Sequence, residues 1–245
     1  MSNYCIIVNT VSTCRDLWDM FFGQLEKHYP NNTVYVFTDD GNGIPAAYRV
    51  IRYNKKDNFR TQYLSCLKSV KEDFLLYLNE DYILYDDVKA DVMNEYLSIL
   101  AQDGALSFIR LTRGANCTSV PYKGRDDLYY LDNRAECFFS QTTTIWKRAA
   151  LEKIHELGPD LHIAGQRTKL QFEVEANKVC AALDMQGLVS HHHEPKRGIV
   201  HYDSLVFPYV ATALVKGKWN LGEYEKELLP LLAAYRIDYK KRGSA

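Results

Sequence analysis

The sequence predicts a mixed α/β fold in which a mainly parallel central sheet is flanked by helices, with a helical C-terminal part. In residues 1–111, short apolar or β-branched runs alternate with segments whose apolar residues recur every three or four positions. This alternation is typical of parallel strands that are joined by helices. Hydrophobic residues make up 47% of the 245 residues, which is enough to bury both faces of such a sheet.

The expected strands of the first half are apolar runs bounded by turn residues. Residues 74–78 (FLLYL) are the most hydrophobic run, so we expect them at the centre of the sheet. Thr13 is expected to cap the first helix, with Asp16 as its capping-box partner. The other expected strands are residues 4–9, 33–38, 49–53 and 105–111, and the other expected helices are residues 59–70 and 86–100.

The second half of the chain differs from the first in composition. Residues 114–125 are rich in Gly, Pro, Ser and Thr and are expected to form a mobile loop, and residues 190–201 form a polar, His-rich connection. Residues 203–215 are expected to be helical, with Pro208 as a kink or break. The remaining expected elements are strands at 128–131 and 137–145 and helices at 147–157, 167–183 and 224–235. No linker or repeat divides the chain, which predicts a single domain over residues 1–245.

Charge and composition exclude several classes of protein. The formal net charge is −1, so no basic excess indicates a nucleic-acid partner. No apolar run approaches the ~20 residues that a transmembrane helix needs. The start of the chain does not resemble a signal peptide, and the six cysteines are scattered without a CxxC pair. These features favour a cytoplasmic protein with reduced thiols.

Polar residues follow the predicted strands at the positions where ligands bind in α/β sheets. Thr10 and Asp39 end the first two strands, Arg60 follows an aromatic residue at a helix start, and Asn79, Glu80 and Asp81 end the most hydrophobic strand. Adjacent acids are costly to bury unless a cation lies beside them. A divalent cation that bridges a diphosphate would suit them, whereas an acidic strand end that faces water or caps the next segment is the alternative.

Five segments resemble those of small bacterial and viral GT-A glycosyltransferases, in the same order. Residues 74–84 (FLLYLNEDYIL) resemble the strand and DxD motif of that family, with Asn79 in place of the first acid. Residues 170–173 (LQFE) resemble its "WefE" segment, with Leu170 in place of Trp. The other three segments are Phe59-Arg60, which resembles an aromatic-Ser-x-Arg segment, residues 139–147 (FSQTTTIWK), which resemble "SLQaaiW(K/R)", and residues 215–219 (VKGKW), which resemble the closing "GKW".

The resemblance covers roughly residues 1–220 and implies a GT-A fold and a function. A sugar would pass from a nucleotide-diphosphate donor to a glycan or lipid-linked acceptor in polysaccharide biosynthesis, assisted by Mn²⁺ or Mg²⁺. Residues 1–111 would form a nucleotide-binding half, residues 112–220 an acceptor half, and residues 221–245 a C-terminal helix and tail. Asp81 would hold the metal, and Glu173 would act as the general base of an inverting transfer.

The resemblance also implies roles for the other polar residues. Thr10 and Asp39 would lie by the nucleobase and ribose, and Arg60, Asn79, Glu80 and Lys218 would help to bind the donor. A C-terminal histidine, His193 or His201, would be a further metal ligand. The bland alternatives are turn chemistry for Thr10 and Asp39, solvated charges for Arg60 and Lys218, and an ordinary polar loop for the histidines.

Two other functions compete with glycosyl transfer. A sugar-nucleotide nucleotidyltransferase normally has a Gly-rich basic loop after the first strand, whereas residues 9–15 (NTVSTCR) contain no glycine. A non-catalytic carbohydrate-binding protein would bind a sugar nucleotide without turning it over.

Overall fold

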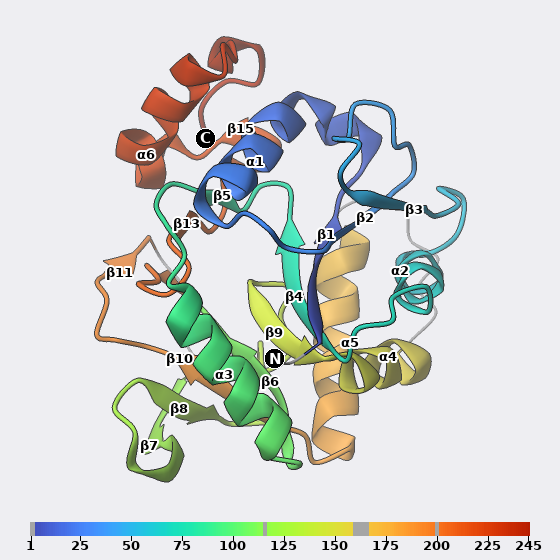
Figure 1. The fold of residues 1–245 in the computed structure, drawn as a ribbon, viewed down its shortest axis with the longest axis vertical. Helices are drawn as coiled ribbons and strands as arrows, with labels where there is room; N and C mark the ends of the chain where they lie inside the picture. Colours follow the sequence, from blue (N-terminus) through green and yellow to red (C-terminus); the bar gives the residue numbers. More distant parts are fainter. Residues whose placement is uncertain (1–2, 115–116, 159–166, 199–200) are drawn as a thin grey trace.

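A nine-stranded sheet forms the centre of the molecule (Figure 1). The computed structural model describes residues 3–114, 117–158, 167–198 and 201–245. The strands of this sheet are β1 (Tyr4–Asn9), β2 (Val34–Thr38), β3 (Arg49–Arg52), β4 (Phe74–Asn79), β6 (Leu106–Arg110), β7 (Cys117–Pro121), β8 (Leu128–Leu131), β9 (Thr144–Lys147) and β10 (Gln186–Ser190). Their order across the sheet is β3-β2-β1-β4-β9-β6-β10-β8-β7.

Most strands run in one direction, as the sequence predicts. The pairs β3–β2, β2–β1, β1–β4 and β6–β10 are parallel, whereas β9 is antiparallel to both β4 and β6, and β8 is antiparallel to β10 and β7. The strands β1, β2, β4, β6 and β10 therefore all end at one edge of the sheet, here called the carboxyl edge. The reversed strand β9 begins there.

Helices cover both faces of the sheet, which makes the fold a mixed α/β fold (Figure 1). Ile6 and Val8 of β1 face one core cluster, whereas Cys5 and Ile7 face the other. This alternation is the period of two that a strand imposes on its side chains. One face is covered by α1 (Arg15–His28) and α3 (Ala90–Gln102), and the other by α2 (Phe59–Leu67), α4 (Arg148–Leu157) and α5 (Arg167–Ala182). None of the helices in the described ranges has the length and apolar composition needed to cross a bilayer.

A third core cluster attaches the C-terminal part to α1. Leu17 and Met20 of α1 pack with Trp219 and with Tyr224 and Leu228 of α6 (Leu221–Ala234). The tail beyond α6 returns to α1, because Arg242 donates from Nε and Nη2 to the two carboxylate oxygens of Asp16, at 2.6 and 2.5 Å. The short strand pairs in this region are β5 (Ile83–Leu84) with β13 (Tyr209–Val210), β11 (Lys196–Arg197) with β12 (His201–Tyr202), and β14 (Leu214–Val215) with β15 (Lys218–Trp219).

The start of α1 differs from the predicted capping box. A short 3-10 turn, Ser12–Cys14, precedes α1, and the N-cap residue Cys14 makes no side-chain cap. The polar side chain that matters there is Ser12, whose hydroxyl donates to Asp39 instead of accepting from a helix N–H. Thr13 is therefore not the cap, because a partner on the neighbouring strand engages this turn.

Five other segments differ from the local predictions. Residues 203–215 are not a helix, since Tyr209 and Val210 pair with β5. Residues 137–143 are not a strand, because Cys137 has a positive φ of 66° and β9 begins only at Thr144. Within residues 114–125, the predicted mobile loop contains β7 and a 3-10 turn at Tyr122–Gly124. The helix predicted from residue 86 begins at Ala90, and β10 was not predicted at all.

His155 of α4 is buried among aromatic rings on the α2–α5 face of the sheet. Its ring stacks on Tyr63, with centroids 4.3 Å apart, and on Phe172, at 4.8 Å. Burial lowers the pKa of His155 to about 4, helped by the nearby Arg60, although a bond from Nδ1 to the Leu151 carbonyl opposes the shift. The folded protein thus keeps this imidazole neutral at pH 7.

We expect this histidine to make folding pH-dependent. Between about pH 6.5 and pH 4 the unfolded chain binds a proton at His155 that the folded chain excludes, so the free energy of unfolding falls as the pH falls, by about 3 kcal/mol at most. His155→Phe keeps the stacking and removes the titration, so its unfolding free energy, measured by urea denaturation across this range, should decline less steeply. The exposed His193→Gln variant is the control. Identical slopes in the wild type and His155→Phe would contradict this account.

Candidate active site

The carboxyl edge gathers most of the polar residues that the sequence singled out. Asn9 of β1 lies beside Asn79 of β4 on one side and Phe37 of β2 on the other. Thr10 and Glu80 directly follow Asn9 and Asn79, and Asp39 lies two residues beyond Phe37. Residues from three separate parts of the chain therefore end in one row, as expected for parallel strands.

Asp39 is fixed firmly at the end of β2. Its carboxylate accepts hydrogen bonds from the backbone N–H of Ser12 at 2.6 Å and from the Ser12 hydroxyl at 2.7 Å, and Lys55 Nζ lies 3.1 Å away. Burial alone would raise the pKa of Asp39, but the bonds from Ser12 and the charge of Lys55 outweigh it and hold that pKa below its ordinary value. Sequence reasoning missed Lys55, which lies beside Lys56 in the polar loop after β3.

Thr10 serves the packing around the same turn. Its hydroxyl accepts a hydrogen bond from the indole N–H of Trp18 at 2.9 Å, and its carbonyl accepts one from the Tyr53 hydroxyl at 2.9 Å. Burial raises the pKa of Tyr53, and the carboxylates of Asp39 and Glu80 raise it further. Tyr53 thus lies near both acids and links the loop after β3 to the ends of β1 and β2.

Asn79 belongs to a buried network centred on Gln141. The Tyr77 hydroxyl lies 2.8 Å from Asn79 Oδ1 and 3.0 Å from Gln141 Oε1. The Asn79 amide and the Tyr82 hydroxyl both donate to the Gln141 carbonyl. Because Gln141 lies just before the reversed strand β9, this network joins the end of β4 to the second half of the chain.

Glu173 meets the same residue from α5. Its Oε1 accepts a hydrogen bond from the backbone N–H of Gln141 at 2.6 Å. Burial raises the pKa of Tyr77 well above its ordinary value, and the carboxylates of Glu173 and Glu80 add to the shift. The structure therefore brings Glu173 close to the Asn79–Glu80 strand end, although 93 positions separate Glu80 from Glu173 in the sequence.

The two acids after Asn79 differ in burial. Glu80 is buried, and its Oε2 has no hydrogen-bond partner among the described residues. Burial raises the pKa of the Cys14 thiol to about 12, and the Glu80 carboxylate beside it contributes to that shift, as does Asp81 more weakly. Asp81 is partly exposed, and its carbonyl accepts a hydrogen bond from the Ala213 N–H at 3.1 Å. Both carboxylates therefore lie near the start of α1.

Arg60 and Lys218 have other surroundings. Arg60 donates from Nε to the His155 carbonyl at 2.5 Å and from Nη2 to the Glu156 carbonyl at 2.6 Å, which satisfies the last turn of α4. Lys218 is exposed on β15, whose partner strand β14 follows Ala213. Lys218 therefore lies on the hairpin that follows Ala213, the residue whose N–H donates to the Asp81 carbonyl, and Arg60 lies against the end of α4.

The two candidate histidine ligands lie beyond β10. His193 is exposed, has a positive φ of 61°, and its ring centroid lies 5.4 Å from that of His191. His201 begins β12 opposite Arg197, and its side chain lies outside the described residues. A metal role for either histidine therefore stays a prediction.

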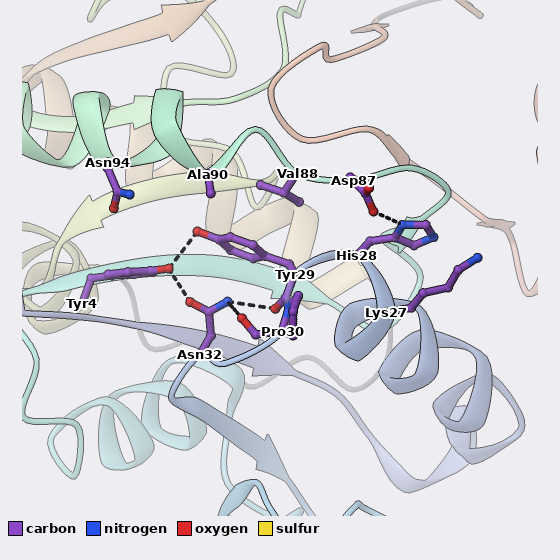
Figure 2. Close-up of a pocket in the computed structure, with 10 residues that line it drawn as sticks. All are labelled: Tyr4, Lys27, His28, Tyr29, Pro30, Asn32, Asp87, Val88, Ala90 and Asn94. Atoms are coloured by element: carbon purple, nitrogen blue, oxygen red, sulfur yellow. Dashed lines mark hydrogen bonds and ion pairs between the residues drawn. The ribbon is translucent and has the colours of Figure 1, made fainter.

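Three possible metal ligands meet elsewhere, at the opposite edge of the sheet. Within the described ranges, His28, Asp86 and Asp87 are the one group of three whose ligand atoms lie within 4.8 Å of one another. They adjoin an open pocket of about 520 Å³ lined by Tyr4, Tyr29, Asn32 and Asn94 (Figure 2). His28 Nδ1 lies 2.7 Å from Asp87 Oδ1, and its buried Nε2 has no described partner. A cation on Nδ1 would force the proton onto this buried nitrogen, which disfavours a metal there.

Comparison with known proteins gives a fold likeness without a family. No family model matches the sequence, and no curated protein matches it significantly. CMP:2-keto-3-deoxy-manno-octonic acid synthetase in complex with CTP is 12% identical, over 77% of this chain and 89% of that chain, with a TM-score of 0.49. A cytidylyltransferase from Leptospira borgpetersenii is 12% identical over 98% of both chains, with a TM-score of 0.49. Residues 1–349 of S. aureus TarS are 13% identical, over 98% of this chain and 66% of that chain, with a TM-score of 0.48.

The bonds around Asp39 generate a test of its structural role. Asp39→Asn keeps the shape but loses the charge that Ser12 and Lys55 stabilise, so we expect the free energy of unfolding to fall by about 1–3 kcal/mol at pH 7 in urea denaturation. Because the pKa of Asp39 is lowered in the folded state, its contribution is lost on acidification, and the two proteins should converge below about pH 4. Asp40 pairs with Arg15 at the surface and provides the control. Asp40→Asn should lower the free energy of unfolding much less. Equal effects of both substitutions would argue against this role.

Proposed function

We propose that this protein is a glycosyltransferase that moves a sugar from a nucleotide-diphosphate donor to a hydroxyl group of a glycan or lipid-linked acceptor. The observation that carries the proposal is the meeting of Glu173 with the end of β4 through Gln141. Such a transfer needs one set of groups for the leaving diphosphate and a separate carboxylate for the acceptor hydroxyl. Asp81 and Glu173 come from the two halves of the chain and supply these two functions at one edge of the sheet.

The strand end fits a hard divalent cation such as Mn²⁺ or Mg²⁺. Asp81 and Glu80 offer carboxylate oxygens, which these ions prefer, and the buried Glu80 Oε2 has no described hydrogen-bond partner. Asp81 would hold the ion, with His193 or His201 as a further ligand, and the bound ion would offset negative charge on the leaving diphosphate. Lys218 would add positive charge on the same side. Thr10 and Asp39 would shape the pocket for nucleobase and ribose rather than react.

Glu173 suits the role of general base. A base must lie where the acceptor hydroxyl approaches the sugar, and its position must be fixed. The hydrogen bond from the Gln141 N–H orients one carboxylate oxygen of Glu173. The hydroxyl oxygen would attack the anomeric carbon as the bond from that carbon to the leaving diphosphate breaks, and the acceptor proton would pass to this carboxylate. Attack from the face opposite the leaving diphosphate gives inversion at that carbon. Glu175, two residues on, instead pairs with Lys178 at 2.8 Å, so it provides a matched control.

The role of Asp81 is tested by nucleotide binding. We expect Mn²⁺ to tighten the binding of a nucleoside diphosphate, with UDP, CDP and GDP as probes in isothermal titration calorimetry. Asp81→Asn should weaken the Mn²⁺-dependent affinity at least about tenfold, a loss of ~1.4 kcal/mol. Asp86→Asn, which alters the other acidic group, is the control and should bind like the wild type. Equal affinities for the wild type and Asp81→Asn would remove Asp81 from the site.

The role of Glu173 is tested by turnover. Glu173→Gln retains an oxygen that can accept from Gln141 but loses the proton acceptor, so kcat should fall by roughly 10²–10⁴-fold while donor affinity stays nearly constant. Glu175→Gln should retain turnover. Sugar nucleotides with and without sugar acceptors are the substrates, and the anomeric configuration of the product is read by NMR.

The same assays separate the competing functions. Product that retains the donor configuration would refute inversion. Pyrophosphate release from a nucleoside triphosphate and a sugar phosphate would identify a nucleotidyltransferase instead. Binding of sugar nucleotides without any turnover would identify a carbohydrate-binding protein.

A further inference from the structure

A second cluster of charged groups lies at the carboxyl edge, next to the candidate active site. Arg113 follows the end of β6, and His191 follows the end of β10, the strand parallel to β6. The Tyr202 N–H donates to the Arg113 carbonyl at 3.1 Å, which brings β12 beside this edge. The proposed transfer so far gives no role to the residues of this cluster.

Glu194 lies at the centre of the cluster, where backbone hydrogen bonds hold its carboxylate in place. Its side chain is buried, and its oxygens accept from the backbone N–H groups of His192 at 2.7 Å and Leu205 at 3.0 Å. His191 Nδ1 lies 2.8 Å from Glu194 Oε2. The Glu194 carboxylate therefore lies against the imidazole of His191 and favours the tautomer with its proton on Nδ1.

Two aromatic groups set the orientation of Arg113. Arg113 Nη1 lies 2.8 Å from His191 Nε2, so the guanidinium donates one N–H to the imidazole. The guanidinium carbon also lies 4.8 Å from the centroid of the Tyr202 ring.

The charge of Arg113 has no carboxylate partner in the part of the chain that the structure describes. Arg113 is only partly exposed, and the buried Nε–H has no hydrogen-bond partner among the described residues. Arg125 and Arg197, in contrast, each pair with two carboxylates. Partial burial costs a guanidinium some of its hydration, and without a carboxylate beside it no ion pair compensates for that cost. Its planar fork matches carboxylate and phosphate groups.

We propose that Arg113, held by His191 and Tyr202, is the binding site for a phosphate or carboxylate group of the substrate. The hydroxyl of Thr112, the residue before Arg113, lies 2.8 Å from the Tyr209 hydroxyl. The Tyr209 ring in turn packs on the Tyr82 ring, with centroids 5.5 Å apart. Tyr82 follows Asp81 directly and bonds to Gln141. The anion would therefore lie on the acceptor side of the candidate active site. Its assignment to an acidic acceptor rests on the proposed glycosyl transfer, whereas the existence of the anion site does not depend on that proposal.

The anion site is tested with simple probes. Glycerol 1-phosphate, glucuronate and neutral glucose would be titrated by NMR or calorimetry against the wild type, Arg113→Ala and Arg113→Lys. We expect millimolar binding of at least one anion, weakened at least about tenfold in Arg113→Ala and less in Arg113→Lys, which keeps the charge but not the fork. Preference between the two anions identifies a phosphate or a carboxylate acceptor. The exposed Arg134→Ala variant is the control and should bind like the wild type.

Further arms separate this proposal from the glycosyltransferase proposal. Anion binding should persist in Asp81→Asn, and Mn²⁺-dependent nucleoside diphosphate binding should persist in Arg113→Ala, which also shows that this variant is folded. Equal anion affinity in the wild type and Arg113→Ala, or binding of glucose as tight as that of both anions, would overturn the anion site. If Arg113→Ala does not fold, unchanged anion affinity in Arg113→Lys would overturn it instead. Anion binding without any glycosyl transfer would overturn only the assignment to an acceptor.

Discussion

The arrangement of the candidate site depends on the turn at Gln141. This residue receives a hydrogen bond from each of two strand-end side chains, Asn79 and Tyr82, and gives its own N–H to Glu173. The Tyr77 hydroxyl donates a hydrogen bond to the side-chain oxygen of Gln141. Buried polar groups are stable only when they are paired, so these bonds fix the distance between the end of β4 and the start of the second half. Core packing of Phe172 and Ala176 also holds α5 against the sheet, and the bond from the Gln141 N–H orients the Glu173 carboxylate.

The strands that could be predicted are those whose signal is local. The runs that form β1, β2 and β4 are apolar or β-branched and bury both faces, so hydrophobicity alone located them. β10 escaped because Gly187 resembles a turn residue, whereas in the fold a side chain there would collide with the ring of Phe108. β13 escaped because Tyr209 and Val210 become a strand only by pairing with Ile83 and Leu84, more than 120 positions earlier. Propensity carries no signal for such pairing.

The same distinction applies to the site. Residues that end strands, such as Asp39 and Asn79, could be expected at the carboxyl edge from topology alone. Arg60 could not be placed, because its partners are carbonyls at the end of a helix about 95 positions away. Lys55 and Arg113 lie in polar segments where cations are ordinary, and only the fold shows which groups they approach. The sequence pattern thus located the strand ends, whereas the partners of the charged side chains could be identified only in the three-dimensional structure.

The clamp between Arg242 and Asp16 has a consequence for the order of folding. These residues are 226 positions apart, and Trp219 is bonded through its backbone to Gly243 and Ala245 in the same tail. Loop closure over such a separation comes late, because little of its entropic cost is repaid by earlier contacts. A chain emerging from the ribosome can assemble β1, β2 and β4 early, but the first turn of α1 can bond to Arg242 only after that distant residue has been made. The edge that carries the candidate site is therefore completed late.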